Sequence, residues 1–324
     1  MAKTPARGAT SRRPSTSALA LAAAAARRFY VEGQTKVDIA RQLGVSRFKV
    51  ARLLADAQEA GLVQIQVVVP SSLDGDLADA VRERFGVRAV YVVRPDDDTV
   101  AGQRRAVATF TAGLLEESVT AEDVVGLAWG RTISQLAAAL SATLGCRFVQ
   151  LSGALPRPDV EESAVELVRR AAEATGSSAT TFYAPLAVPD AATADGLRSQ
   201  SGISEALAEL DRLTRAVVSV GAWRPGESTA LDSLGTADRD ALAAAGAVAE
   251  ITGVLLGAGG TEIDALADRI IGVTGPQLRA TPDVVAMACG DLRAEATASV
   301  LRSGLVSTLV THASLARAVL ATPS

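Results

Sequence analysis

Arg131 belongs to a segment whose residue types and order fit an anion-binding site. The segment Val124–Leu127 is apolar, and Trp129, Gly130, Arg131 and Thr132 follow it at the start of a helical pattern. Gly130 permits close backbone approach, Arg131 offers a guanidinium fork, and Thr132 offers a hydroxyl. The first amides of a helix also lack acceptors within it, which favours a bound anion. We predict a phosphate site here, with an ordinary strand-to-helix turn as the alternative.

Other predicted strands also end in small residues. Examples are Ser152-Gly153, Gly221-Ala222 and Cys289-Gly290. Open α/β sheets bind ligands in a crevice at such carboxyl ends, so Ser152 and Gly153 join the candidate effector-binding residues. Gly257-Ala258-Gly259-Gly260 resembles part of a dinucleotide-binding loop but lacks its spacing and acidic partner. We interpret that stretch as a flexible loop.

A second group of residues, 35–54, has the features of a helix-turn-helix. Thr35 and Ser46 are suited to cap two short helices, and Ala40 allows a close helix crossing. Gly44 permits the left-handed turn, and Val45 follows it as an apolar residue for the core. The second helix then leaves one side for the major groove of DNA. The predicted DNA-binding residues are Thr35, Ser46, Arg47, Phe48, Lys49 and Arg52.

Charge is distributed unevenly along the chain. Residues 1–70 hold 11 Lys and Arg against 4 Asp and Glu, whereas the whole chain carries a net charge of −4. Residues 1–70, the head, are basic, and the rest of the chain, the body, is acidic. This division is typical of a DNA-binding module joined to a domain that avoids DNA. A three-helix cap with no nucleic-acid role is the alternative.

Catalysis has little support in the residues of the body. The only lysines are Lys3, Lys36 and Lys49, so Schiff-base chemistry is excluded beyond Lys49. The single histidine, His312, has no nucleophile motif around it and suits a helix start or a surface position. Two cysteines with one histidine make a zinc site improbable. Glu250 and Asp291 are possible bases, but no spacing singles out a pair, and we expect no metal, cofactor or catalytic residue.

The elements expected around these residues form two domains after a basic tail at 1–16. Three helices (Thr16–Glu32, one beginning after Thr35, and Ser46–Ala60) and a strand at Leu62–Val69 predict a winged helix-turn-helix over 17–70. From 71 to 324, short valine-rich strands alternate with helices, which predicts a Rossmann-like parallel sheet and an α/β fold. The expected strands are Ala89–Val93, Val124–Ala128, Phe148–Ser152, Ala216–Val220, Val284–Ala288 and Val306–Val310. Expected helices include Ile133–Leu140, Glu161–Ala174, Ser204–Leu213, Leu292–Arg302 and Ala313–Leu320.

The compartment can also be predicted from the sequence. Two cysteines, Cys146 and Cys289, cannot form a disulfide framework, which favours a reducing, cytoplasmic environment. No uncharged apolar run reaches the roughly 18 residues of a membrane span. The apolar stretch Ala18–Ala26 continues the helical pattern into Arg27-Arg28, so we do not interpret it as a signal peptide.

These motifs, in this order, resemble the SorC family of sugar-responsive regulators. In the head the resemblance rests on Phe29–Thr35, Ile39-Ala40 and Leu43–Arg47. In the body it rests on Trp129–Thr132, Val149–Gly153, Ala288–Gly290 and Leu309–His312, continuing to Ala316. The resemblance covers nearly all of the chain after the tail.

The resemblance implies a non-catalytic body related to ribose-phosphate isomerase folds and a sugar-phosphate effector. It also implies homodimers or homotetramers on palindromic double-stranded operators. By position, Gly130, Arg131 and Thr132 would hold the phosphate, Arg269 would assist, and Arg293 would join the effector-binding set.

The chain departs from the family pattern at three positions. The family usually has aspartates where Gly257 and His312 stand, and a lysine where Arg293 stands. The resemblance therefore implies that the residues expected to bind the phosphate of the effector are retained, whereas the residues expected to bind its hydroxyls are altered. A sugar-phosphate isomerase-like enzyme with an accessory helical domain, and a winged-helix interaction protein, remain the alternative functions.

Overall fold

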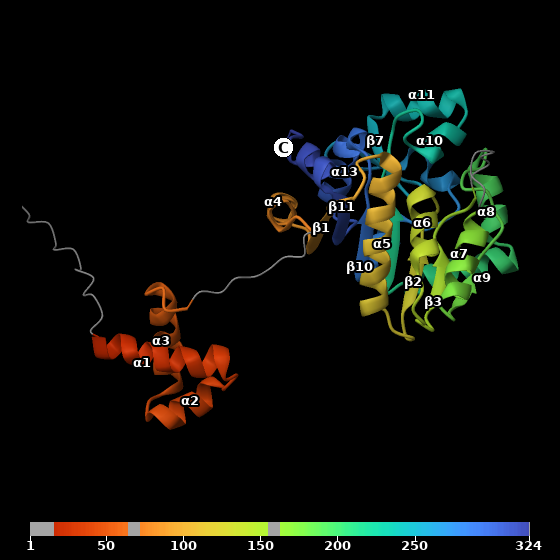
Figure 1. Cartoon of the computed structure of the whole chain (residues 1–324). Helices are drawn as coiled ribbons and strands as arrows, with labels where there is room; N and C mark the ends of the chain where they lie inside the picture. The colour runs from red at the N-terminus through yellow and green to blue at the C-terminus, as the bar shows by residue number, and fades with distance from the viewer. Residues whose placement is uncertain (1–15, 64–71, 155–162, 324) are drawn as a thin grey trace, which may run out of the picture. The chain divides into compact units, whose positions relative to one another are not determined.

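A computed structural model of the chain describes residues 16–63, 72–154 and 163–323 (Figure 1). The chain divides into two compact units, Met1–Val68 and Val69–Ser324. None of the helices in these described ranges is long and apolar enough to cross a membrane.

The described residues of the first unit, 16–63, form three helices. They are α1 Thr16–Ala26, which continues as a π-helical turn η1 Arg27–Val31, α2 Lys36–Leu43 and α3 Arg47–Glu59. The Thr35 and Ser46 hydroxyls accept hydrogen bonds from the amides of Asp38 and Lys49, as expected of N-terminal caps. Gly44 lies in the left-handed region with φ of 64°, which gives the tight turn between α2 and α3.

Small and branched aliphatic side chains hold these helices together. The core of the first unit consists of Ala22, Ala25, Ala26, Ile39, Ala40, Val50, Leu53, Leu54 and Ala57. Alanines at the crossings let the helix axes approach closely. The predicted wing strand, Leu62–Val69, lies mostly outside the described residues, and Leu62 and Val63 are not in a strand.

The second unit is built on a seven-stranded parallel sheet of order β1-β11-β10-β5-β2-β3-β4. Its strands are β1 Ala89–Val93, β2 Val124–Leu127, β3 Arg147–Gln150, β4 Ser178–Thr180, β5 Arg215–Ser219, β10 Asp283–Met287 and β11 Thr308–His312. All six predicted strands are present. The structure shifts the last from Val306–Val310 to Thr308–His312 and adds β4.

A second, antiparallel sheet was not predicted. Its order is β6-β7-β8-β9, with β6 Gly221–Ala222, β7 Ala247–Ile251, β8 Val254–Gly257 and β9 Glu262–Ile263. The stretch interpreted as a flexible loop is a hairpin turn here, because the Gly257 amide donates to the Thr261 carbonyl and the Gly260 amide to the Gly257 carbonyl.

Helices cover the parallel sheet (Figure 1). The α-helices of this unit are α4 Gly75–Phe85, α5 Val100–Ser118, α6 Arg131–Ala139, α7 Ala164–Ala174, α8 Ala191–Arg198, α9 Ser201–Ala208, α10 Thr229–Ser233, α11 Thr236–Ala244, α12 Gly275–Ala280, α13 Ala294–Arg302 and α14 Ala313–Leu320. The described residues of this unit also form the 3₁₀ turns η2 Glu209–Arg212, η3 Asp264–Arg269 and η4 Asp291–Arg293. Helices α5, α6 and α7 pack side by side, and α4, α13 and α14 form another packed group.

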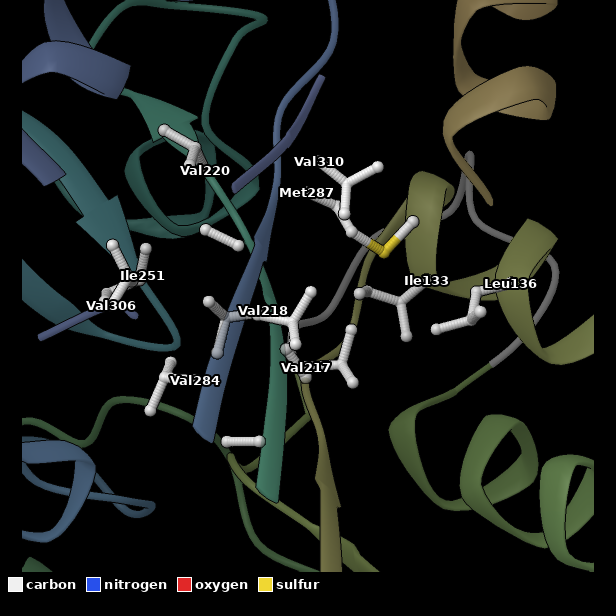
Figure 2. Packing of buried hydrophobic residues seen from close by; sticks show 14 of the residues in the cluster. Ile133, Leu136, Val217, Val218, Val220, Ile251, Val284, Met287, Val306 and Val310 are labelled. Atoms are coloured by element: carbon white, nitrogen blue, oxygen red, sulfur yellow. The ribbon is translucent and has the colours of Figure 1, made fainter. Parts of the chain in front are cut away.

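The sheet is buried on both faces, as its apolar strands predict. Figure 2 shows Ile133 and Leu136 of α6 on the side of Val217 and Met287, with Ile251 and Val306 on the opposite side. Residues on adjacent positions of β5, such as Val217 and Val218, are both fully buried because they face opposite layers.

Candidate functional site

A pocket lies at the carboxyl ends of β2, β5 and β10. It encloses about 700 Å³, including space open to solvent. In the sheet, β2 and β5 are neighbours. The strands that follow β2 in the chain, β3 and β4, lie on one side of this pair, and the strands that follow β5, namely β10 and β11, lie on the other side. This reversal of strand order is the place where open α/β sheets bind ligands.

The predicted anion-binding turn lines this pocket. Gly130 has φ of 148°, and a Cβ there would lie 3.3 Å from the Ser219 hydroxyl. Arg131 is exposed at the first position of α6, and Thr132 is buried at the second. The opening amides of α6 therefore face the same pocket as the Arg131 guanidinium, which is an arrangement suited to a phosphate.

Arg293 also reaches the pocket, from the turn after β10. Its Nη1 donates to the Cys289 carbonyl at 2.7 Å, and its Nη2 lies 2.6 Å from a carboxylate oxygen of Glu227. Burial lowers the pKa of Arg293, and the Glu227 carboxylate opposes this shift. The charge of Arg293 is thus matched within the protein.

Arg104 is a third arginine in the pocket, and the sequence patterns did not single it out. It lies on the first turns of α5 and is partly buried. Burial lowers its pKa, and the nearby positive charges of Arg131 and Arg293 lower it further. Its position follows from the packing of α5 against α6, which brings residues 27 positions apart to one cavity.

The pocket is also lined by oxygen-bearing side chains from the antiparallel sheet and from the start of α10. Glu250 of β7 accepts a hydrogen bond from the Gly253 amide at 3.2 Å and one from the Ser228 hydroxyl at 3.4 Å. Burial raises the pKa of the Glu250 carboxyl. The Thr252 side chain is also buried there, and its hydroxyl has no hydrogen-bond partner among the described residues. Such groups can read the hydroxyls of a polyol.

Several predicted effector-binding residues meet in this pocket, and two do not. Trp129, Gly130, Arg131, Thr132, Ser152 and Arg293 all line it. Gly153 does not, because it packs against the backbone: a Cβ there would lie 2.4 Å from the Pro185 carbonyl oxygen. Arg269 is also elsewhere. Its two Nη atoms bind the Asp238 carboxylate at 2.9 and 2.8 Å, and its Nε binds the Val188 carbonyl.

The positions that depart from the SorC pattern are also mostly outside the pocket. Gly257 and His312 do not line it, whereas Arg293 does. His312 is buried rather than on the surface, at the start of α14. Its Nε2 accepts a hydrogen bond from the Gly290 amide at 3.0 Å, which supports the turn after β10.

The pocket has no activated nucleophile among its described residues. Burial raises the pKa of the Cys289 thiol to about 12, so the thiol stays protonated at neutral pH. Neither a lysine nor the histidine lines the pocket. Within the described ranges, no cluster of three or more His, Cys, Asp and Glu side chains could hold a metal ion.

The candidate DNA-reading surface in the first unit is the exposed side of α3. Val50, Leu53, Leu54 and Ala57 are buried on its other side. The predicted residues Arg47, Phe48, Lys49 and Arg52 are all exposed, as are the capping residues Thr35 and Ser46. Phe48 is 79% exposed, and the Arg47 guanidinium lies 5.6 Å from its ring centre.

Comparison with known proteins identifies the class of this chain. The family model described as "Putative sugar-binding domain" matches residues 70–321. The second unit therefore matches a sugar-binding domain family over nearly its whole length. The chain belongs to the SorC family of sugar-binding transcriptional regulators.

Relatives along nearly the full length agree with this assignment. The deoxyribonucleoside regulator of Bacillus subtilis is 29% identical over 302 residues, covering 91% of this chain and 95% of that protein. The transcriptional regulator LsrR of Enterobacter sp. is 28% identical, covering 90% of each. The crystal structure of the full-length sorbitol operon regulator SorC from Klebsiella pneumoniae has a TM-score of 0.71 at 20% identity, covering 94% of this chain and all of that one. All three of these proteins are named as regulators, which favours the regulator interpretation over the isomerase-like alternative.

Proposed function

We propose that this regulator binds operator DNA through α3 and changes that binding when a small phosphorylated sugar or related polyol fills the pocket. Residues 17–70 form the DNA-binding domain, and residues 71–324 form the effector-binding and oligomerisation domain. The effector-binding residues are Trp129, Gly130, Arg131, Thr132, Ser152 and Arg293. The regulator works in the cytoplasm as a homodimer or homotetramer on a palindromic operator.

One observation carries the effector proposal: cationic groups and hydroxyl-binding groups line the same pocket. The cationic group consists of Arg131 and the start of α6, and the hydroxyl-binding group consists of Glu250, Ser228 and Thr252. A phosphate carries about −1.5 to −2 charges at pH 7 and suits the cationic group. Sugar hydroxyls suit the other group, because each hydroxyl can both donate and accept a hydrogen bond. The names of two relatives, a deoxyribonucleoside regulator and an erythritol catabolism regulatory protein, support an effector derived from a small sugar or polyol.

The DNA proposal is supported by the charge and exposure of α3. Arg47, Lys49 and Arg52 can reach phosphates or guanine edges from a helix held rigidly by its buried side. The pocket and the operator are coupled through a population shift. The effector binds one arrangement of the oligomer more tightly, so the population shifts to that arrangement and takes on its affinity for the operator.

The test is effector-dependent DNA binding by the full-length protein. An operator selected from random double-stranded DNA is titrated with the regulator, with and without a panel of sugar phosphates and their unphosphorylated counterparts. We expect at least one phosphorylated compound to change the operator affinity ten-fold or more, and Arg131→Ala to remove that change while leaving effector-free DNA binding intact. An effect of the unphosphorylated compound alone, or an unchanged response in Arg131→Ala, would contradict the phosphate assignment.

A further inference from the structure

Arg104 and Arg131 are the two pocket arginines that form no ion pair with another described residue. Arg293 has the Glu227 carboxylate 2.6 Å from its Nη2. Neither Arg104 nor Arg131 makes an ion pair or a side-chain hydrogen bond to any residue in the described ranges. Arg104 is partly buried, so its guanidinium has lost hydration without gaining such a partner, whereas Arg131 is exposed and lines the same pocket. These two unpaired positive charges favour the binding of an anionic ligand in the pocket.

The first turns of α5 hold Arg104 in place. The Thr99 hydroxyl accepts from the Gly102 amide at 3.1 Å, and the buried Gln103 donates to the Asp98 carbonyl at 3.1 Å. A Cβ at Gly102 would lie 2.4 Å from the Asp97 carbonyl oxygen, so the helix start is tightly packed against the loop before it. The backbone beneath Arg104 is therefore fixed, and its side chain is directed to the pocket.

The charges around the pocket indicate how much negative charge the ligand carries. Glu227 forms an ion pair with Arg293, and burial raises the pKa of the Glu250 carboxyl. Arg104 and Arg131 are the two lining guanidiniums without an ion-pair partner in the described ranges. One phosphate monoester, at about −1.5 to −2, balances them. A bisphosphate would leave an excess negative charge facing Glu227.

We infer that Arg104 of α5 and Arg131 of α6 form a two-armed clamp for a single phosphate monoester, with Arg104 as a phosphate-binding residue in addition to the α6 turn. This inference rests on the proposed effector function and narrows the effector to monophosphates. Two forks from adjacent helices can each give charge-assisted hydrogen bonds to the same group. The clamp also implies that the empty pocket is strained by the repulsion between its two arms.

The neighbouring Arg105 provides a matched control. It is exposed, its Nη2 lies 3.3 Å from an Asp97 carboxylate oxygen, and it does not line the pocket. Arg104→Met and Arg105→Met each remove one guanidinium from the same helix and keep most of the apolar stem. Arg131→Met tests the arm that the proposed function requires.

The experiment measures the thermal midpoint of the full-length protein and its affinity for inorganic phosphate, at constant ionic strength set with chloride. We expect Arg104→Met to weaken phosphate binding about ten-fold or more, and to leave the ligand-free midpoint equal to or above that of the wild type. Arg105→Met should bind phosphate as the wild type does. A residue with a merely structural role would lower the ligand-free midpoint instead.

Two results would overturn this inference and are distinguishable. If Arg131→Met loses phosphate binding while Arg104→Met keeps it, Arg104 is not part of the site, and the proposed function stands. If phosphate binds the wild type no better than chloride does, or binds both variants as tightly as the wild type, the phosphate site itself is wrong.

Discussion

At the scale of single residues, Thr252 combines two unfavourable features at the pocket. It occupies the two-residue turn between β7 and β8 with φ of 51°, a conformation that β-branched residues avoid, and its buried hydroxyl has no partner in the described part of the chain. Such strain costs about 1–3 kcal/mol and tends to persist where function needs it. Replacing Thr252 by glycine relieves this strain but adds conformational entropy to the unfolded chain. We expect the net effect of Thr252→Gly to be a rise of about 1 kcal/mol in the free energy of unfolding of the ligand-free protein.

The same variant should weaken effector binding, because the effector loses a hydroxyl partner. Calorimetric titration with the compound that changes operator affinity measures this loss. A more stable Thr252→Gly protein with unchanged effector affinity would show that the hydroxyl does not contact the ligand.

His312 predicts a pH dependence of stability. Its Nε2 accepts the Gly290 amide, Ser314 lies at its Nδ1, and the Ser314 hydroxyl donates to Asp291. Burial lowers the pKa of His312, although Asp291 and Asp98 act in the opposite direction. The folded state thus disfavours protonation, so this contribution is present above the unfolded value of about 6.5 and is lost as the pH falls from there through the folded pKa. Urea midpoints from pH 7.5 to 5 should fall more steeply for the wild type than for His312→Gln; parallel curves would exclude His312 as the cause.

At the scale of elements, α3 should act through both its charge and its buried side. Replacing Arg47 and Arg52 by alanine removes two exposed cations without touching the core formed by Val50, Leu53 and Leu54. We expect operator affinity to fall at least ten-fold, and the slope of log affinity against log salt to decrease by about two if both contact phosphates. Arg82→Ala with Arg212→Ala removes two exposed, ion-paired cations from the second unit and should leave both quantities unchanged. An equal effect of the two pairs would mean that net charge, rather than α3, sets DNA binding.

At the scale of the whole molecule, each unit has its own hydrophobic core. The buried residues described in the core of the first unit are aliphatic and come from its helices, and the largest core of the second unit surrounds the parallel sheet. Separate cores allow separate unfolding. Calorimetric scans should show two transitions, with the effector raising the midpoint of the larger and operator DNA raising that of the smaller. A single transition shifted equally by both ligands would instead indicate one cooperative unit.

The helix-turn-helix could be predicted almost residue by residue because its signals are local. The caps Thr35 and Ser46, the turn at Gly44, and the spacing of Val50, Leu53 and Leu54 act within a few residues of one another. The parallel strands were predictable for a similar reason, since each is a short buried run of valines and leucines. The start of β11 was misplaced because Leu305 and Val306 are as buried as the strand itself, so hydrophobicity does not mark where pairing begins.

The sequence by itself determined the class of fold, the exposed cations of α3 and the turn at Gly130 and Arg131. Tertiary structure alone decided which distant side chains share the pocket. It brought in Arg104, Glu250 and Thr252, and it directed Arg269 to Asp238, 31 residues away. The physical reason is that backbone propensities and caps act over a few residues, whereas a ligand pocket is assembled from elements whose proximity depends on the packing of the entire sheet.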